Sequence, residues 1–95
     1  MYKTYKEKEK TIIYPEGNLF EEESENLRLC IIGLINTGEK HLCFDLSKVE
    51  IMCSRALLIF LVLSKQVNND GISYEFIKTN PSILDLLKAA KIIKN

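Results

Sequence analysis

Residues 41–68 read HLCFDLSKVEIMCSRALLIFLVLSKQVN and contain the two patterns that decide the fold. The first, His41 to Leu46, is an apolar run with one late aspartate, which is typical of a strand buried on both faces of a sheet. The second, Ser54 to Asn68, continues past its apolar run into polar residues, so its length predicts a helix. A buried strand followed by a helix is the building unit of an α/β sheet.

The residues before this stretch predict two strands and a helix. Tyr2–Tyr5 and Thr11–Tyr14 flank the charged run KEKEK, which indicates two short strands joined by a solvated turn. Three glutamates, Glu21 to Glu23, suit the start of a helix, and Thr37-Gly38 suits its end. The expected core face of this helix carries Phe20, Leu27, Ile31 and Leu34, whereas Leu29 and Ile32 fall off it.

The residues after it continue the alternation. Ile72 to Ile77 alternates as a strand should, and Asn80-Pro81 predicts the start of a helix that runs to about Ala90. Lys91 to Asn95 has room for a short last strand. The order predicts one α/β domain over residues 1–95, with four to five mostly parallel or mixed strands and three helices packed on one sheet.

Composition excludes several classes of function. The 95 residues suit one domain, and 13 basic residues balance 13 acidic ones, so nothing favours nucleic acid or an anionic membrane surface. The longest apolar run, Ala56 to Leu63, is far shorter than the roughly 20 residues of a membrane span. With no visible signal peptide, we expect a cytoplasmic protein without membrane insertion.

Residues with chemical potential are sparse. Cys30, Cys43 and Cys53 stand at wide spacings and are interpreted as small apolar residues instead of a disulfide or metal set. Cys53 and the single histidine, His41, are expected at opposite ends of the sheet, which argues against cysteine catalysis. Asp45 is interpreted as a loop-capping residue. We therefore predict no enzyme, no cofactor and no metal.

The helix at 54–68 has an unusual surface. At about 100° per residue, its core side carries Leu57, Phe60, Ser64 and Val67, and its opposite side carries Arg55, Lys65, Gln66 and Asn69. Leu58, Ile59 and Val62 fall among those polar residues. Contiguous exposed apolar side chains usually mark an interaction site, so this face predicts a protein interface. An extra helix or a homodimer could cover the same patch.

The stretch FDLSKVEIMCSRALLIFL, residues 44–61, resembles the STAS domain, a family named for sulphate transporters and anti-sigma-factor antagonists. Asp45-Leu46-Ser47 matches the family's strand end, and Gly17-Asn18-Leu19 resembles its G-x-L before the first helix. Residues 71–87 resemble its later strand, turn and helix. The family's D-S-S-G signature aligns with Cys53, Ser54, Arg55 and Ala56, so only Ser54 agrees. The chain also stops before the further helix of most members.

The resemblance implies a switch at Ser54, which corresponds to the serine that many bacterial antagonists have phosphorylated. A helix start favours a phosphate, because its free amides and dipole attract an anion. The alternative is a plain N-cap serine. Arg55 either pairs with a phosphate or supplies a fixed positive charge. The implied partner surface comprises Asn18, Cys53, Ser54, Arg55, Leu58, Ile59 and Val62.

Two functions remain open at this point. The first is a transcription-regulating module that docks an anti-sigma factor or serine kinase and is switched by phosphorylation at Ser54. The second is a constitutive subunit of a larger assembly, such as one bound to the ATPase of an ABC lipid-transport complex. A pocket for a nucleotide or lipid is a third class, although no residue specifies one.

Overall fold

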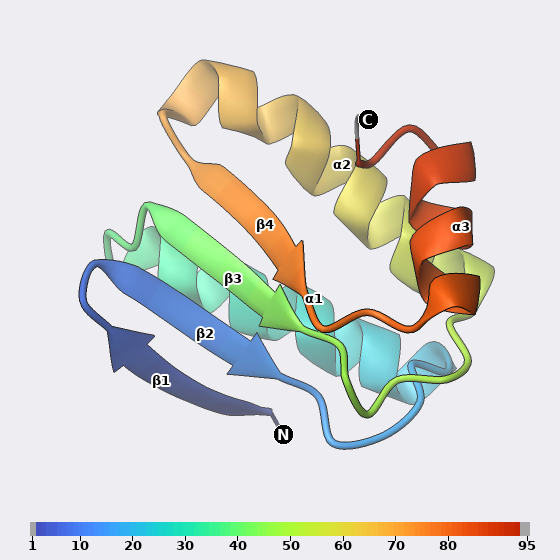
Figure 1. The fold of residues 1–95 in the computed structure, drawn as a ribbon. Helices are drawn as coiled ribbons and strands as arrows, with labels where there is room; N and C mark the ends of the chain where they lie inside the picture. The colour runs from blue at the N-terminus through green and yellow to red at the C-terminus, as the bar shows by residue number, and fades with distance from the viewer. Residues whose placement is uncertain (1, 94–95) are drawn as a thin grey trace.

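The computed structural model of the chain describes residues 2–93, without the side chains of residues 67–70. Its centre is a four-stranded sheet in the order β1-β2-β3-β4 (Figure 1). The strands are β1 (Lys3–Glu7), β2 (Lys10–Tyr14), β3 (His41–Asp45) and β4 (Ser73–Ile77). β1 pairs with β2 in antiparallel fashion, and the other two pairs are parallel. The predicted α/β class with a mixed sheet is therefore confirmed.

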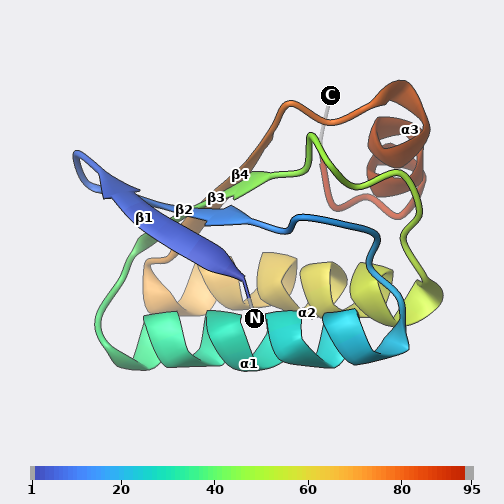
Figure 2. The same cartoon turned by 90° about the horizontal axis from the view of Figure 1, so that it is seen from below.

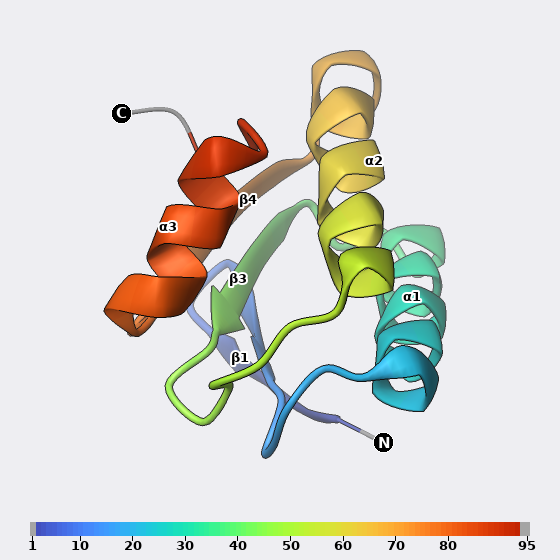
Figure 3. The same ribbon diagram turned by 90° about the vertical axis from the view of Figure 1, so that its right-hand side faces the viewer.

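Three helices complete the fold: α1 (Glu21–Asn36), α2 (Ser54–Asp70) and α3 (Pro81–Ala89). Figure 2 shows α1 and α2 side by side on one face of the sheet. α3 lies beyond the carboxyl ends of β3 and β4, and Figure 3 places it on the β4 side of the molecule, away from α1. Within the described residues, no helix combines the length and the apolar character that crossing a membrane requires.

The N-terminal hairpin is longer than its sequence indicates. The strands extend through the charged run, with Glu7 opposite Lys10, so that only two residues form the turn. The first of them, Lys8, has a φ of 59°. All five residues of β1 are exposed, and charged side chains on such an outer strand stay in water while the backbone pairs.

The predicted buried strand is confirmed as β3, which lies between β2 and β4 with four of its five residues buried. Its Phe44 joins Phe60 of α2 and Phe76 of β4 in an aromatic cluster with ring centroids 5.0–5.4 Å apart. The cluster fixes α2 against the sheet, because aromatic pairs at such distances gain attraction beyond their buried area.

The core faces of the two long helices differ in part from the prediction. On α1, Leu27 and Ile31 are buried as expected, but Phe20 is the exposed N-cap residue. On α2, the fully buried residues are Ala56, Phe60 and Leu63. The expected core residues Leu57 and Ser64 are only half-buried. The side chains of Val67 and Asn69 lie outside the described part of the chain.

Residues 91–93, the described part of the expected last strand, do not form a strand. The backbone N–H of Ile92 donates to the Leu87 carbonyl at 2.9 Å, and Lys91 adopts a φ of 60°. Such a left-handed residue after a helix closes its last turn and redirects the chain. Residues 91–93 therefore form a turn that buries Ile92, while residues 94 and 95 lie outside the described part.

β4 forms one outer edge of the sheet. The Ser73 amide donates to Lys40, and the Ile77 carbonyl accepts from Leu46, so both residues direct their backbone groups toward β3. Because backbone direction alternates along a strand, the N–H and C=O groups of Tyr74 and Phe76 point away from β3. The Tyr74 hydroxyl donates to the Ile92 carbonyl at 2.6 Å.

Candidate functional site

Two loops meet at the start of α2 and hold it in place. The Asn18 Oδ1 atom accepts hydrogen bonds from the amides of Glu50 at 2.8 Å and Ile51 at 2.9 Å. Leu19 then pairs with the same loop, since its amide donates to Ile51 and its carbonyl accepts from Cys53, both at 2.9 Å. Asn18 thus positions the site by its side chain. Contact between Asn18 and a partner stays a prediction.

The N-cap of α2 is Cys53, so the interpretation of Ser54 as the cap is wrong. Cys53 has an extended backbone, and its side chain makes no capping hydrogen bond. Its Sγ atom lies 3.3 Å from the Oγ of the buried Ser24 on α1. Ser54 is the first helical residue and is exposed. Among the described residues, none forms a hydrogen bond with its hydroxyl group.

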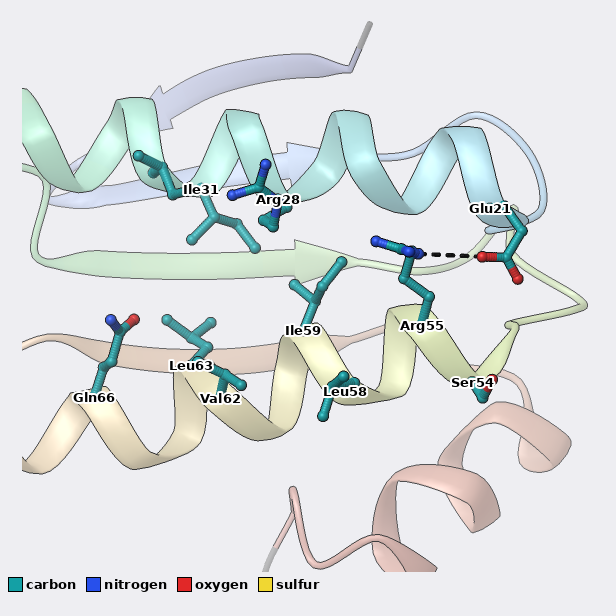
Figure 4. A pocket seen from close by; sticks show the side chains of 11 residues that line it. Glu21, Arg28, Ile31, Ser54, Arg55, Leu58, Ile59, Val62, Leu63 and Gln66 are labelled. Atoms are coloured by element: carbon teal, nitrogen blue, oxygen red, sulfur yellow. Dashed lines mark hydrogen bonds and ion pairs between the residues drawn. The ribbon is translucent and has the colours of Figure 1, made fainter.

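Arg55 ties α2 to α1. Its Nε atom lies 3.1 Å from Oε2 of Glu21 (Figure 4). Its Nη1 atom lies 3.5 Å from Oε1 of Glu25. Arg28 also binds Glu25, and this contact lowers the pKa of the Glu25 carboxyl group. Two acids and two arginines therefore form a balanced network at one end of the helix pair.

The three apolar residues expected on the outer face of α2 do not share one environment. Leu58 is 59% exposed and Val62 is 50% exposed, as predicted. Ile59 is half-buried and packs against the core, so its assignment to the solvent face is wrong. Figure 4 shows Ile59 pointing toward Ile31 of α1. The cause is α1 itself, which covers this side of α2.

An open groove of about 790 Å³ runs between the two helices, here called the α1–α2 groove. Its lining residues are Glu21, Arg28, Ile31, Ile32, Ser54, Arg55, Leu58, Ile59, Val62, Leu63 and Gln66. The contribution of α1 was missed from the sequence. A signal was present, because Ile32 falls off the core face of its helix and is 41% exposed.

Other reactive side chains lie apart from this site. His41 begins β3 and Cys53 precedes α2, and the starts of these two elements lie at opposite ends of the molecule (Figure 1). The Nδ1 atom of His41 is 2.5 Å from Ser73 Oγ. Asp45 Oδ1 accepts the Ser47 amide at 3.0 Å, which confirms its loop-capping role. Burial raises the pKa of the Cys30 and Cys43 thiols. Among the side chains that the structure describes, those of residues 2–66 and 71–93, no cluster of three potential metal ligands occurs.

Comparison with known proteins reveals one family. A family model described as the STAS domain matches residues 2–95. Among solved structures, the unphosphorylated anti-sigma factor antagonist SpoIIAA superposes with a TM-score of 0.81 at 14% identity, covering 97% of this chain and 82% of that one. Its phosphorylated form, described as a Bacillus cell fate determinant, gives 0.78 at 14% identity, covering 97% and 85%.

A segment of a much longer protein has the same fold. The murine anion transporter Slc26a9, in its inward-facing state, gives a TM-score of 0.67 at 16% identity, covering 84% of this chain and 13% of that one. No curated protein matches by sequence. Identities this low establish a shared fold, and the family model supplies the link in sequence.

Proposed function

The chain belongs to the STAS domain family, a family of regulatory protein-interaction modules, and from this premise we propose that it acts as an anti-sigma-factor-antagonist-like switch. It docks an anti-sigma factor or serine kinase in the cytoplasm and catalyses nothing itself. The observation that carries this proposal is an exposed, unbonded serine at the start of a helix whose next turns expose Leu58 and Val62.

The electrostatics at Ser54 suit a phosphate. The first turn of α2 contains no acidic residue, and the Cys53 side chain does not cap it. The Ala56 amide donates to the Cys53 carbonyl at 3.1 Å, but the amides of Ser54 and Arg55 have no acceptor among the described residues. These two amides are available to an anion, which the helix dipole also favours. A phosphoserine adds about −1.5 to −2 charges at neutral pH, enough to repel or recruit a charged partner.

The surface next to Ser54 suits protein docking. Leu58 and Val62 follow along the exposed side of α2, one and two turns from the serine. Arg55 and the Asn18-supported loop border the same end of the helix. Apolar side chains next to an arginine are the usual composition of an interface core. Cys53 and Ile59 are half-buried between this surface and the core.

The test combines phosphate transfer with binding. We expect a partner kinase with ATP to phosphorylate Ser54, which mass spectrometry can detect. We also expect the Kd for the partner, measured by calorimetry, to differ about tenfold or more between Ser54→Asp and Ser54→Ala. Ser82 is a matched control, since it is exposed in the first turn of α3, and Ser82→Asp should bind like the wild type. Equal binding by Ser54→Ala and Ser54→Asp would remove the switch from the proposal.

A second candidate is a constitutive subunit bound to an ATPase, for instance in an ABC lipid-transport complex. Its support is Arg55, which is already engaged by Glu21 and Glu25 within the chain. The structural similarity to a segment of an anion transporter also shows that this fold occurs within a transport protein. In this case Leu58→Asp abolishes binding to the ATPase, whereas Ser54→Asp leaves it unchanged.

A further inference from the structure

We propose that the α1–α2 groove binds the α2 helix of a second copy of this chain, so that the protein forms a two-fold symmetric homodimer. No kinase, ATPase or nucleotide is needed for this association. It is therefore independent of the proposed switch, and either can fail without the other.

The first support is the apolar surface that spans both helices. Leu58 and Val62 on α2 and Ile32 on α1 are 41–59% exposed, and all three line the groove. Ile31 and Leu63 are buried and belong to the groove lining. Burial of apolar side chains is the main favourable contribution to association, and a continuous patch concentrates it.

The spacing along α2 makes this surface complementary to itself. Leu58 and Val62 are four residues apart and so lie one turn apart on the same side of the helix. A two-fold axis between them places Leu58 against Val62 of the second copy, and Val62 against Leu58. Each aliphatic side chain then meets another, as an isologous interface requires.

The charges fit the same arrangement. Arg55 stands three residues before Leu58, and Lys65 three residues after Val62, so the axis brings Lys65 of the second copy to the level of Arg55. Glu21 lies at that level, has a 73% exposed side chain and binds Arg55 through Oε2 alone. Lys65 forms no ion pair within the described residues. Two symmetric Glu21–Lys65 contacts would thus flank the apolar centre.

Interface size explains why both helices are needed. A stable specific interface buries about 800 Å² on each partner, more than Leu58 and Val62 alone expose. The second copy's α2 must therefore lie within the groove and also contact Ile32 of α1. The network of Glu21, Glu25, Arg28 and Arg55 carries no net charge, so it does not repel Lys65 of the second copy, which the antiparallel arrangement brings to the same end of the groove.

Sedimentation equilibrium of the chain alone tests the proposal. We expect a monomer–dimer equilibrium in which Val62→Asp raises the dimer Kd about 30-fold or more, because the interface would bury an unpaired carboxylate. Leu86→Asp is the control, because Leu86 is 38% exposed and lies on α3, far from the groove. The dimer Kd of this variant should equal that of the wild type. A wild type that is monomeric at about 1 mM, or equal effects of both variants, would overturn the dimer.

Charge reversal tests the orientation. Lys65→Glu and Glu21→Lys should each weaken the dimer about 3- to 10-fold at low salt, and the double variant should recover most of the loss. These side chains are exposed, so folding should persist, as circular dichroism can verify. A double variant no tighter than either single variant would refute the antiparallel arrangement.

Discussion

Asn18 shows how much one polar side chain contributes to the site. Its Oδ1 atom satisfies two amides of the loop before α2, at 2.8 and 2.9 Å. Asn18→Ala leaves both amides without this acceptor, so we expect urea unfolding to show a loss of about 1–3 kcal/mol. Asn18→Asp keeps an acceptor oxygen and should cost less. Equal losses in the two variants would contradict this role.

Tyr2 gives the molecule a pH dependence on the alkaline side. Its hydroxyl donates to the Glu23 carbonyl, and burial, aided by Glu23, raises its pKa to about 12. An unfolded tyrosine has a pKa of about 10. The folded state thus holds the proton more tightly, and this contribution is complete below about pH 10 and disappears as the pH rises toward 12.

The matching experiment compares the wild type with Tyr2→Phe, which has no ionisable group at this position. We expect their difference in unfolding free energy to be constant up to about pH 9.5 and to shrink between about pH 10 and 12. Chemical denaturation at several pH values measures it. A difference that stays constant to pH 12 would show that the Tyr2 pKa is not raised.

At the scale of elements, α2 has two sides with different roles. Phe60 is fully buried in the aromatic cluster, whereas Leu58, two residues away, is 59% exposed. Phe60→Ala should therefore lower the unfolding free energy by about 3–5 kcal/mol, because it leaves a cavity. At protein concentrations well below the dimer Kd, Leu58→Ala should change it by no more than about 0.5 kcal/mol. Similar losses at both positions would mean that Leu58 is not on a free surface.

The same helix shows why the sequence pattern does not predict its orientation on the sheet. Its eight consecutive apolar residues make every side look apolar, so only the polar residues could orient it. Arg55 was placed on the solvent side, but it turns toward the acids of α1. The predicted orientation is therefore shifted: Leu57 and Ser64, expected in the core, are only half-buried, and Ile59, expected on the solvent side, packs against the core.

Elements whose ends or core faces are marked by their own residues are predictable from the sequence. Asn80-Pro81 predicted the start of α3, and the Asn80 Oδ1 atom does accept the Ile83 amide at 2.9 Å. β3 was recognised because it is apolar and bounded by turn residues. β1 extended further than expected, because its charged side chains give no strand signal and its pairing comes entirely from β2.

At the scale of the whole molecule, the groove depends on contacts that no local pattern contains. Glu21 and Arg55 stand 34 positions apart in the chain, and only the packing of α1 beside α2 brings them to 3.1 Å. The sequence could indicate Ser54, Leu58 and Val62 one by one. It could not indicate that Ile32 and Arg28 would face them, because that requires the order and direction of the helices.

The proposed dimer makes stability depend on protein concentration. Association with the folded state alone stabilises it by mass action. We expect the Tm of the wild type, measured by scanning calorimetry, to rise over a concentration range of about 100-fold, and the Tm of Val62→Asp to stay constant. A constant wild-type Tm would argue against dimerisation. Because Leu58 and Val62 serve both proposals, a docked partner and a second copy would exclude one another.

The outer strand β4 has a consequence for handling the protein. Tyr74 and Phe76 offer unpaired backbone groups along it, and neither a proline nor a bulge blocks the edge. In antiparallel edge-to-edge stacking centred on this strand, Glu75 would face its own copy and like charges would repel. Glu75→Gln removes this charge and its ion pair with Lys10 at 3.0 Å, so we anticipate that the variant precipitates at a lower protein concentration than the wild type at neutral pH.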